Sequence, residues 1–312
     1  MAEAISREII ERFGNLELLA REVVEGFITG LHKSPFHGFS VEFAEHRLYN
    51  TGESTRHIDW KLFARTEKHF VKRYEEETNL RAWMVIDHSS SMNFPEDAKQ
   101  RNIFNKLQFS IYAAATLIEL FKRQRDAIGL SVFSDKMEEH TPAKLSQAHL
   151  KQLYPILENL LQNQITQKQT SAIESLHQIA ERIHKRSLVI LFSDMMDSYG
   201  NLDDLFGALQ HLKHNKHEAI IFHVIDKQKE LDFEFQNRPT QFIDLESGVN
   251  VKLHPNAVKE AYIKQMNEFD REIKLKAGQY AIDYIKADIN KGFDQVLQAY
   301  LVKRNRMLKG GR

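Results

Sequence analysis

One stretch decides the fold of this 312-residue chain: Leu80-Arg81-Ala82-Trp83-Met84-Val85-Ile86-Asp87-His88-Ser89-Ser90-Ser91-Met92-Asn93. The run from Ala82 to Ile86 is apolar without alternation, which is typical of a strand buried on both faces of a parallel sheet. Asp87 then stands at the carboxyl end of that strand, and Ser89 and Ser91 follow in a loop. Because ligands of open α/β sheets gather outside the carboxyl ends of the strands, we expect this loop to carry the function.

The loop offers a particular set of ligand atoms. Alternate residues of an extended loop can point the same way, so the Asp-x-Ser-x-Ser spacing can direct three side-chain oxygens to one point. Hard oxygen donors with a single charge among them suit Mg²⁺ or Mn²⁺ better than zinc. Serine and aspartate are also common in loops because they hydrogen-bond to their own backbone, so a turn without any ion is the simpler interpretation of this spacing taken alone.

From residue 80 onward, buried-strand runs alternate with amphipathic helices. A helix is predicted to start at Pro95 to Asp97, and a short edge strand is predicted to end near Pro142. The other predicted strands are 126–133, 187–193, 219–225 and 280–285. The other predicted helices are 145–161, the part of 166–186 that follows Thr170, 203–214, 255–276 and 293–301. The basic tail 303–312 is predicted to be frayed. The alternation predicts an α/β fold with a doubly wound, mostly parallel sheet.

Residues 1–79 differ in character and form a predicted N-terminal helical and irregular extension to a domain of residues 80–312. Apolar residues at helical spacing predict one or two helices within residues 2–30. From Arg47 to Tyr74 basic residues are interleaved with aromatic ones. Such a mixture can bind nucleic acid, but acidic residues in the same stretch offset its charge, so we expect a structural arm. A β-hairpin is predicted at the periphery of the larger domain, near 242–253.

The composition excludes several classes of function. Lys plus Arg and Asp plus Glu both number 43, so no overall field attracts nucleic acid or an anionic membrane. The chain has no cysteine, which excludes disulfides, thiol catalysis and cysteine-ligated metal sites. Neither a signal peptide nor an apolar run of membrane-spanning length is visible. We therefore expect a soluble cytoplasmic protein.

Two further oxygen donors occur at the ends of other predicted elements. Thr170 stands where a polar stretch turns into an amphipathic helix, so it is also a candidate helix N-cap. Asp194 ends the buried run 187–193 just as Asp87 ends its own strand. Because Phe-Ser-Asp also occurs at 133–135, the pattern alone does not rank Asp194 above Asp135.

Taken together, these donors carry a resemblance to known proteins. The set Asp87, Ser89, Ser91, Thr170 and Asp194 resembles the metal-ion-dependent adhesion site of von Willebrand factor A domains. The sequence before it is similar to the signature block of the DUF58 family, in the motifs Glu42-Phe43-Ala44-Glu45, Arg47-x-Tyr49, Gly52-Glu53, Arg56, Ile58-Asp59-Trp60-Lys61, Ala64-Arg65-Thr66, Val71-Lys72-Arg73 and Glu75-Glu76-Glu77. Further matches follow at Phe242-Ile243-Asp244-Leu245 and Asp283-Tyr284, so the resemblance covers nearly the whole chain. Gly-Glu at 52–53 departs from the more common Gly-Asp.

The resemblance implies a function. In that family the A-type domain is taken to be a non-catalytic, metal-dependent interaction module, often encoded beside MoxR-type AAA+ ATPases. Ser89, Ser91 and Thr170 would touch Mg²⁺ or Mn²⁺, and Asp87 and Asp194 would bind it directly or through water. A cation held by three neutral hydroxyls and two carboxylates keeps positive character and an open position, which a partner's carboxylate can fill. We therefore expect an adaptor or co-chaperone and not an enzyme.

Other chemistries remain open on the same sequence. A magnesium-dependent hydrolase could activate a water beside Asp87 and Asp194, with His88 as the nearby titratable group. The motifs of a serine hydrolase, Gly-x-Ser-x-Gly, and of a P-loop NTPase are absent. Three histidines spaced three apart could hold zinc, although a solvated helix end is the commoner cause of such spacing: His211, His214 and His217.

Overall fold

The computed structural model describes residues 15–31, 46–48, 60–72, 80–162, 172–184, 186–196, 202–214, 216–245 and 248–310. The chain divides into two compact units, one of residues 28–79 and one that joins residues 1–27 to 80–312. In the smaller unit, helix α3 (Trp60–Thr66) accompanies an antiparallel pair of strands, β1 (His46–Leu48) and β2 (Phe70–Lys72). Residues 49–59 and 73–74 of the arm predicted from Arg47 to Tyr74 lie outside the described residues, so its role stays a prediction.

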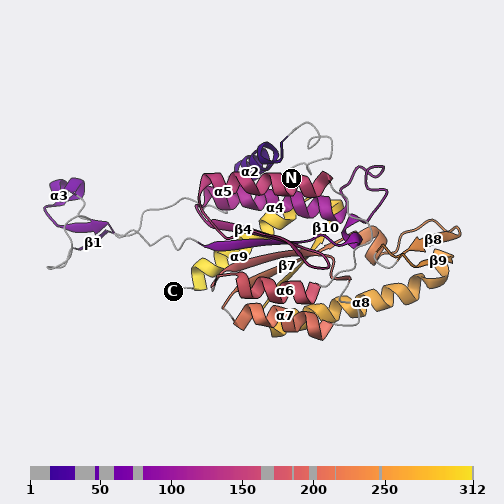
Figure 1. The fold of residues 1–312 in the computed structure, drawn as a ribbon. Helices are drawn as coiled ribbons and strands as arrows, with labels where there is room; N and C mark the ends of the chain where they lie inside the picture. Colours follow the sequence, from indigo (N-terminus) through magenta and orange to yellow (C-terminus); the bar gives the residue numbers. More distant parts are fainter. Residues whose placement is uncertain are drawn as a thin grey trace. The chain divides into compact units, whose positions relative to one another are not determined.

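A six-stranded sheet forms the centre of the larger unit (Figure 1). Its strands are β3 (Arg81–Asp87), β4 (Ala127–Phe133), β5 (Met137–His140), β6 (Leu188–Ser193), β7 (Glu218–Ile225) and β10 (Asp283–Asp288). They lie in the order β10-β7-β6-β3-β4-β5, and every pair is parallel except β4 with β5. The chain builds this sheet outward from β3 in both directions, which confirms the predicted doubly wound α/β fold. The direction of building changes between β3 and β6, and this junction is the topological switch point.

Helices cover both faces of the sheet (Figure 1). On one face lie α4 (Lys106–Arg123), α5 (Gln147–Gln162) and α9 (Asp294–Gly310), and on the other lie α6 (Ala172–Arg182), α7 (Leu202–His214) and α8 (Pro255–Gln279). Because both faces are covered, β6 is buried at every residue, which is why its sequence lacks alternation. Helix α2 (Leu16–Leu31) packs outside this layer, where Glu17 binds Lys122 of α4 at 3.0 Å.

The helix after the site loop begins later than its sequence predicts. Residues 90–93 form a 3₁₀ turn, and α4 starts only at Lys106. A capping box sets this start, because the Asn105 side chain accepts the Gln108 N–H at 2.8 Å and the Gln108 side chain accepts the Asn105 N–H at 3.3 Å. The late start places Lys106 in the first turn of the helix, beside the site loop.

The C-terminal elements also differ from their predicted bounds. The strand predicted at 280–285 begins later, as β10 from Asp283 to Asp288, because a turn at Tyr280 first ends α8. Helix α9 continues through most of the tail that was predicted to be frayed. It is anchored there by Lys303, which binds Glu218 at 2.6 Å and Asp283 at 2.8 Å.

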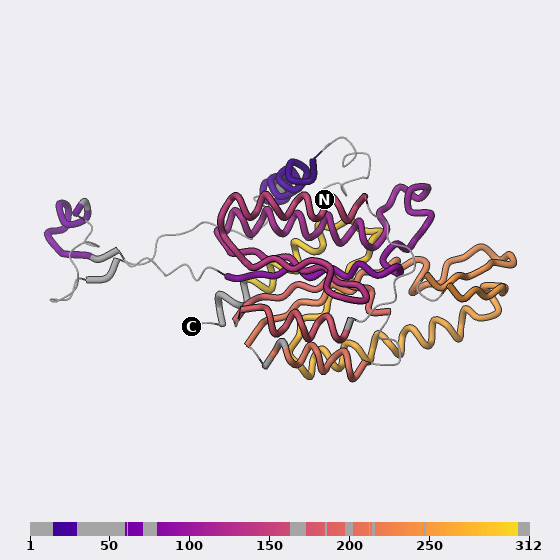
Figure 2. The backbone as a smooth tube through the Cα atoms, in the orientation of Figure 1, coloured from indigo at the N-terminus to yellow at the C-terminus, as the bar shows by residue number. Residues whose placement is uncertain are grey.

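Several short elements gather where the parallel strands end. Strand β8 (Thr240–Ile243) pairs antiparallel with β9 (Asn250–Leu253), and Figure 2 shows this hairpin at the carboxyl end of the sheet. A π-helical turn, η4 (Lys227–Leu231), follows β7, and a short 3₁₀ helix, η5 (Ile289–Lys291), follows β10. The carboxyl edge is therefore covered by segments that begin where the strands stop.

Gly129 in β4 allows the close approach of Trp83 in β3. A Cβ atom on Gly129 would lie 2.4 Å from Trp83 Nε1, and this buried indole donates its N–H to the Thr141 carbonyl at 3.2 Å. We expect Gly129→Ala to displace the ring and lower the free energy of unfolding by about 1–3 kcal/mol, as overpacking of a core does. Urea-induced unfolding measures the change. Gly207→Ala in α7 is the control, because nothing lies within 4 Å of the added Cβ. An unchanged unfolding midpoint for G129A would contradict this packing.

Candidate metal centre

Carboxylates stand at the ends of four neighbouring parallel strands. Asp87 is the last residue of β3, Asp288 is the last residue of β10, and Asp194 and Asp226 directly follow β6 and β7. These strands are adjacent in the sheet, so the acidic residues form a row along its carboxyl edge. Asp87 and Asp194 flank the switch point, which is where open α/β sheets bind ligands.

Asp87 is a buried carboxylate with both oxygens held. It is 3% exposed, its Oδ1 accepts the Ser89 N–H at 2.9 Å, and its Oδ2 accepts the Ser193 hydroxyl at 2.6 Å. Burial and, after it, the negative charge of Asp194 raise the pKa of Asp87 to about 6. The two carboxylates are therefore close enough to repel each other, and a cation beside both would relieve that repulsion.

The structure brings the two predicted serine ligands together. Ser89 is buried, and its Oγ lies 3.0 Å from Ser91 Oγ. In an octahedral Mg²⁺ shell with metal–oxygen distances of about 2.0–2.1 Å, neighbouring oxygens are roughly 3.0 Å apart. A hydrogen bond from Ser91 also helps to lower the pKa of Asp194. Four predicted ligands, Asp87, Ser89, Ser91 and Asp194, thus lie together at the carboxyl edge.

A lysine that the sequence analysis did not assign to the site reaches the second carboxylate. Lys106 is 1% exposed, and its Nζ lies 2.6 Å from Asp194 Oδ2 and 2.7 Å from Glu230 Oε1. Burial alone would lower the pKa of Lys106, but the charges of Asp194 and Glu230 raise it above its ordinary value. Burial would likewise raise the pKa of Asp194, but the Lys106 ammonium lowers it. The lysine is therefore charged and Asp194 is ionised.

The donor set fits a hard divalent cation. Two neutral hydroxyls at the spacing of a coordination shell, with two buried carboxylates beside them, are the oxygen ligands that Mg²⁺ or Mn²⁺ prefers. Thr170 lies outside the described residues, so its role as a ligand stays a prediction. Within the described ranges no group of three or more His, Asp or Glu side chains could hold a metal, so a site here depends on its hydroxyls. Lys106 is a competing cation at Asp194.

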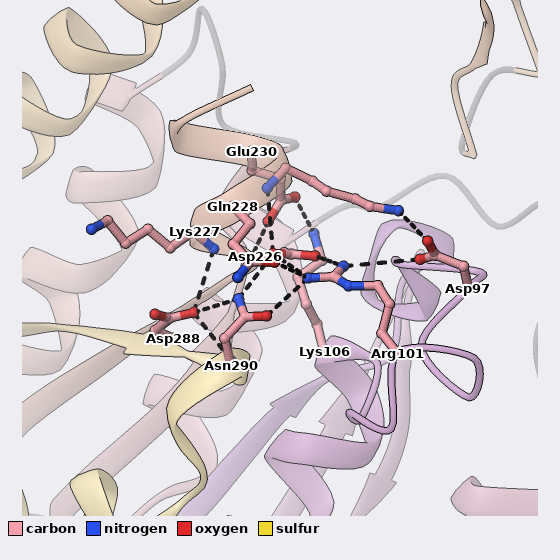
Figure 3. A network of polar contacts seen from close by, with 10 residues as sticks. Asp97, Arg101, Lys106, Asp226, Lys227, Gln228, Glu230, Asp288 and Asn290 are labelled. Atoms are coloured by element: carbon pink, nitrogen blue, oxygen red, sulfur yellow. Dashed lines mark hydrogen bonds and ion pairs between the residues drawn. The ribbon is translucent and has the colours of Figure 1, made fainter. Parts of the chain in front are cut away.

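A polar network continues from this centre to β7 and β10 (Figure 3). Asp226 is fully buried, binds the Arg101 guanidinium, and accepts a hydrogen bond from Asn290 Nδ2 at 2.9 Å. Burial would raise the pKa of Asp226, but the hydrogen bonds from Arg101 lower it. The Asp226 N–H donates to Glu230 Oε2 at 2.7 Å, and Glu230 also binds Lys106. A continuous chain of contacts therefore links Arg101 to the candidate metal centre.

Two histidines lie close to the centre in sequence or in space. His88 Nδ1 lies 2.9 Å from Glu138 Oε2 of β5, the edge strand beyond β4. His223 Nε2 lies 2.9 Å from the Asp194 carbonyl oxygen, and its Nδ1 contacts the Tyr284 hydroxyl. Burial lowers the pKa of His223 to about 4. The His223 ring is therefore neutral, and both its nitrogens have partners.

The histidines considered for zinc have other neighbours. His211 Nδ1 lies 3.3 Å from His177 Nδ1 of α6. His217 Nδ1 accepts the Ser187 N–H at 3.1 Å, and burial lowers the pKa of His217. The side chain of His214 lies outside the described part of the chain.

Lys106 and Glu230 are the site residues that sequence reasoning missed. They join the centre through contacts that span 88 residues to Asp194 and 124 residues to each other. One signal was present: a lysine in the first turn of a helix opposes the helix dipole, so such a residue needs a partner elsewhere. That signal depends on knowing where α4 begins, and the sequence predicted an earlier start.

Comparison with known proteins gives the family relation. The family profile described as "Protein of unknown function DUF58" matches residues 45–272. An uncharacterized protein of Mycobacterium tuberculosis (strain ATCC 25618 / H37Rv) is 27% identical over 134 residues, which are 43% of this chain and 41% of that relative. The chain thus spans less than half the length of the curated relative that it matches.

Two solved structures resemble the larger part of the chain. The conserved hypothetical protein BatB from Bacteroides thetaiotaomicron matches with a TM-score of 0.46 and 14% identity, over 74% of this chain and 99% of BatB. The VWA domain of SpRpn10 matches with a TM-score of 0.35 and 10% identity, over 68% of this chain and 89% of that domain. Among the described helices, none combines the length and the apolar character needed to cross a membrane.

Proposed function

The chain belongs to the DUF58 family, and we propose that its α/β domain is a non-catalytic protein-binding module that works through a divalent cation. The ion is Mg²⁺ or Mn²⁺, and the residues that would hold it are Asp87, Ser89, Ser91, Thr170 and Asp194. The observation that carries this proposal is the 3.0 Å approach of the Ser89 and Ser91 hydroxyls beside two buried carboxylates at the switch point.

The chemistry of the centre favours an acidic ligand. When bound, the ion supplies an open coordination position of positive character, which a carboxylate can fill. The repulsion that raises the pKa of Asp87 favours entry of a cation, and the hydroxyl ligands add no negative charge that would repel an acidic partner. The partner that the family resemblance suggests is a MoxR-type AAA+ ATPase or its client protein, which would offer an aspartate or glutamate to the ion.

The surroundings of the centre favour binding over hydrolysis. A hydrolase would need a general base within hydrogen-bond reach of a metal-bound water. His223 has partners at both nitrogens. His88 Nδ1 is paired with Glu138, whereas the buried His88 Nε2 has no hydrogen-bond partner among the described residues, so the alternative of a hydrolase depends on His88. Lys106 is held in its charged form by two carboxylates, so it cannot accept a proton. These side chains hold the site together and leave the ligand position to a partner.

A pull-down with a MoxR-type AAA+ ATPase from the same genome tests the proposal. We expect the chain to retain the ATPase in excess Mg²⁺ and to lose it in EDTA. Ser89→Ala and Ser91→Ala should abolish retention, because each removes a neutral ligand from the ion. Ser134→Ala is the control, because it removes another buried serine beyond the end of the neighbouring strand β4. Equal retention in Mg²⁺ and EDTA would rule out metal dependence, and no retention in either would rule out this partner.

A further inference from the structure

We propose that Lys106 is a built-in competitor for the divalent ion and sets the metal affinity of the centre, an inference that rests on the proposed function. Its ammonium binds Asp194 Oδ2 at 2.6 Å, on a carboxylate that the ion would use. Its second contact, with Glu230 Oε1 at 2.7 Å, is to a carboxylate outside the ligand set. The centre therefore holds a cation of its own whenever the ion is absent.

The position of Lys106 is not explained by local structure. It is the first residue of α4, where the helix dipole favours negative over positive charge. It is also 1% exposed, and burial of an unpaired ammonium is strongly unfavourable. Among the described residues, the ion pairs with Asp194 and Glu230 are the charged contacts that compensate for both effects, and the Phe94 ring lies 5.5 Å from the ammonium. Lys106 is therefore held by the carboxylates of the centre and not by the helix that carries it.

The charges decide the direction of the effect. Three carboxylates, those of Asp87, Asp194 and Glu230, accompany one ammonium, so the metal-free centre attracts a divalent ion. Lys106 weakens that attraction by one positive charge and occupies one oxygen of Asp194. Glu230 acts in the opposite sense, because it offers the ammonium a place away from Asp194. Removal of Lys106 should therefore tighten metal binding, and removal of the Glu230 charge should weaken it.

Competition by Lys106 couples the ion to the partner. When the protein alone binds the ion weakly, occupancy of the site depends most on an additional ligand. The partner's carboxylate supplies that ligand. Because coupling between two ligands is reciprocal, the partner then tightens the ion as much as the ion tightens the partner. In the absence of Lys106, the ion should stay bound whether or not a partner is present.

Isothermal titration of Mg²⁺, and separately of Mn²⁺, into the full chain tests this inference. We expect Lys106→Met to bind each ion at least about tenfold more tightly than wild type, because a unit charge a few ångströms from a divalent ion is worth more than the 1.4 kcal/mol that corresponds to tenfold. Glu230→Gln should bind each ion more weakly. Lys122→Met is the control, because Lys122 also lies on α4 and binds two carboxylates, those of Glu17 and Glu119. Its metal affinity should equal that of wild type.

The metal affinities of K106M and E230Q are expected to change in opposite directions. This distinguishes the proposed role from a purely structural one, because damage to the fold would weaken metal binding in both variants. If K106M fails to fold, E230Q keeps the inference falsifiable, because unchanged or tighter metal binding by folded E230Q would overturn it. Equal affinity of folded K106M and wild type would overturn the inference and leave the proposed function standing. Binding by K106M but not by wild type would support the role of Lys106 and contradict the proposed function. No binding by any of the proteins would overturn both.

Discussion

Replacement of Asp87 by asparagine is expected to stabilise the metal-free protein at pH 8 by up to about 3 kcal/mol and to remove its response to Mg²⁺. Burial and the charge of Asp194 raise the pKa of Asp87 from 3.8 to about 6, and each unit is worth about 1.4 kcal/mol. Asparagine keeps the shape of aspartate, and its side-chain oxygen can still accept the Ser89 N–H. The Ser193 hydroxyl can turn so that its oxygen accepts a hydrogen bond from the asparagine amide N–H. The variant therefore loses the charge that the empty site disfavours and keeps the hydrogen bonds.

The pH dependence of this effect follows from the direction of the shift. Because the folded-state pKa lies above the unfolded value, the contribution of Asp87 to stability is present below pH 4 and is lost as the pH rises through about 6. The difference between the variant and wild type should therefore be small below pH 4, reach about half of its full size near pH 5 and be largest at pH 8. Urea-induced unfolding in EDTA at several pH values measures it.

Added metal should close most of the gap between the two proteins. An ion at a hundred times its dissociation constant stabilises wild type by about 2.7 kcal/mol and should leave Asp87→Asn unchanged. Asp135→Asn is the control, because Asp135 is an exposed acid beyond the end of the neighbouring strand β4. A loss of several kcal/mol by D87N in EDTA would show that Asp87 is a structural acceptor, and the metal-site interpretation of this loop would then be abandoned.

The central strands could be predicted because burial on both faces leaves a direct mark on sequence. The apolar runs that became β3 and β6 have no polar face to solvate, so each ends abruptly at its first acidic residue, Asp87 or Asp194. The site loop followed from the same boundary. The hydroxyl oxygens of its two serines lie 3.0 Å apart, but the 3₁₀ turn at residues 90–93 takes the place of the extended loop from which the Asp-x-Ser-x-Ser spacing predicted their approach.

The choice between Asp194 and Asp135 could not be made from the pattern of residues. Both follow Phe-Ser at the end of a buried strand, and each of these strands lies next to β3. The structure separates them by topology, because Asp194 follows β6 at the switch point, whereas Asp135 stands exposed in the turn between β4 and β5. Periodicity carries no information about which neighbour of β3 lies across the switch point, and the family resemblance supplied that choice.

The cations of the carboxyl edge were also beyond sequence reasoning. Arg101 lies in residues 94–105, which form an irregular connection where the sequence predicted a helix, and Lys106 is the first residue of α4. Their partners, Asp226 and Asp194, lie 125 and 88 residues away, respectively. A local pattern shows that a residue is charged, but only the fold shows which buried carboxylate it meets.

Replacement of Arg101 by methionine is expected to lower the free energy of unfolding by about 3–5 kcal/mol, because it leaves the Asp226 carboxylate buried without its cation. The same guanidinium donates to Gln228 Oε1 and Asn290 Oδ1, both at 2.9 Å, so the change also releases η4 and η5 from the loop before α4. In wild type, burial would raise the pKa of Asp226, but Arg101 lowers it below its ordinary value. Urea-induced unfolding measures the loss.

The pH dependence and a double variant identify the cause. With a lowered folded-state pKa, Asp226 contributes stability in wild type that is present above its unfolded value and is lost as the pH falls. R101M removes the largest effect that opposes burial and keeps the hydrogen bonds from Asn290 Nδ2 and the Lys229 N–H, so the pKa of Asp226 should rise. The deficit should therefore shrink as the pH falls and the carboxyl takes up a proton. Asp226→Leu added to R101M should recover most of the loss, because apolar residues can replace a buried ion pair at little cost. Arg123→Met is the control at about 1 kcal/mol or less, because the Arg123 side chain is 32% exposed, its ion pair with Glu25 is screened by water, and the buried Glu119 keeps its ion pair with Lys122. If R101M lowers the free energy of unfolding no more than R123M does, the network along the carboxyl edge does not stabilise the fold. The contacts from Arg101 through Asp226 and Glu230 to the metal centre would then contribute nothing to stability.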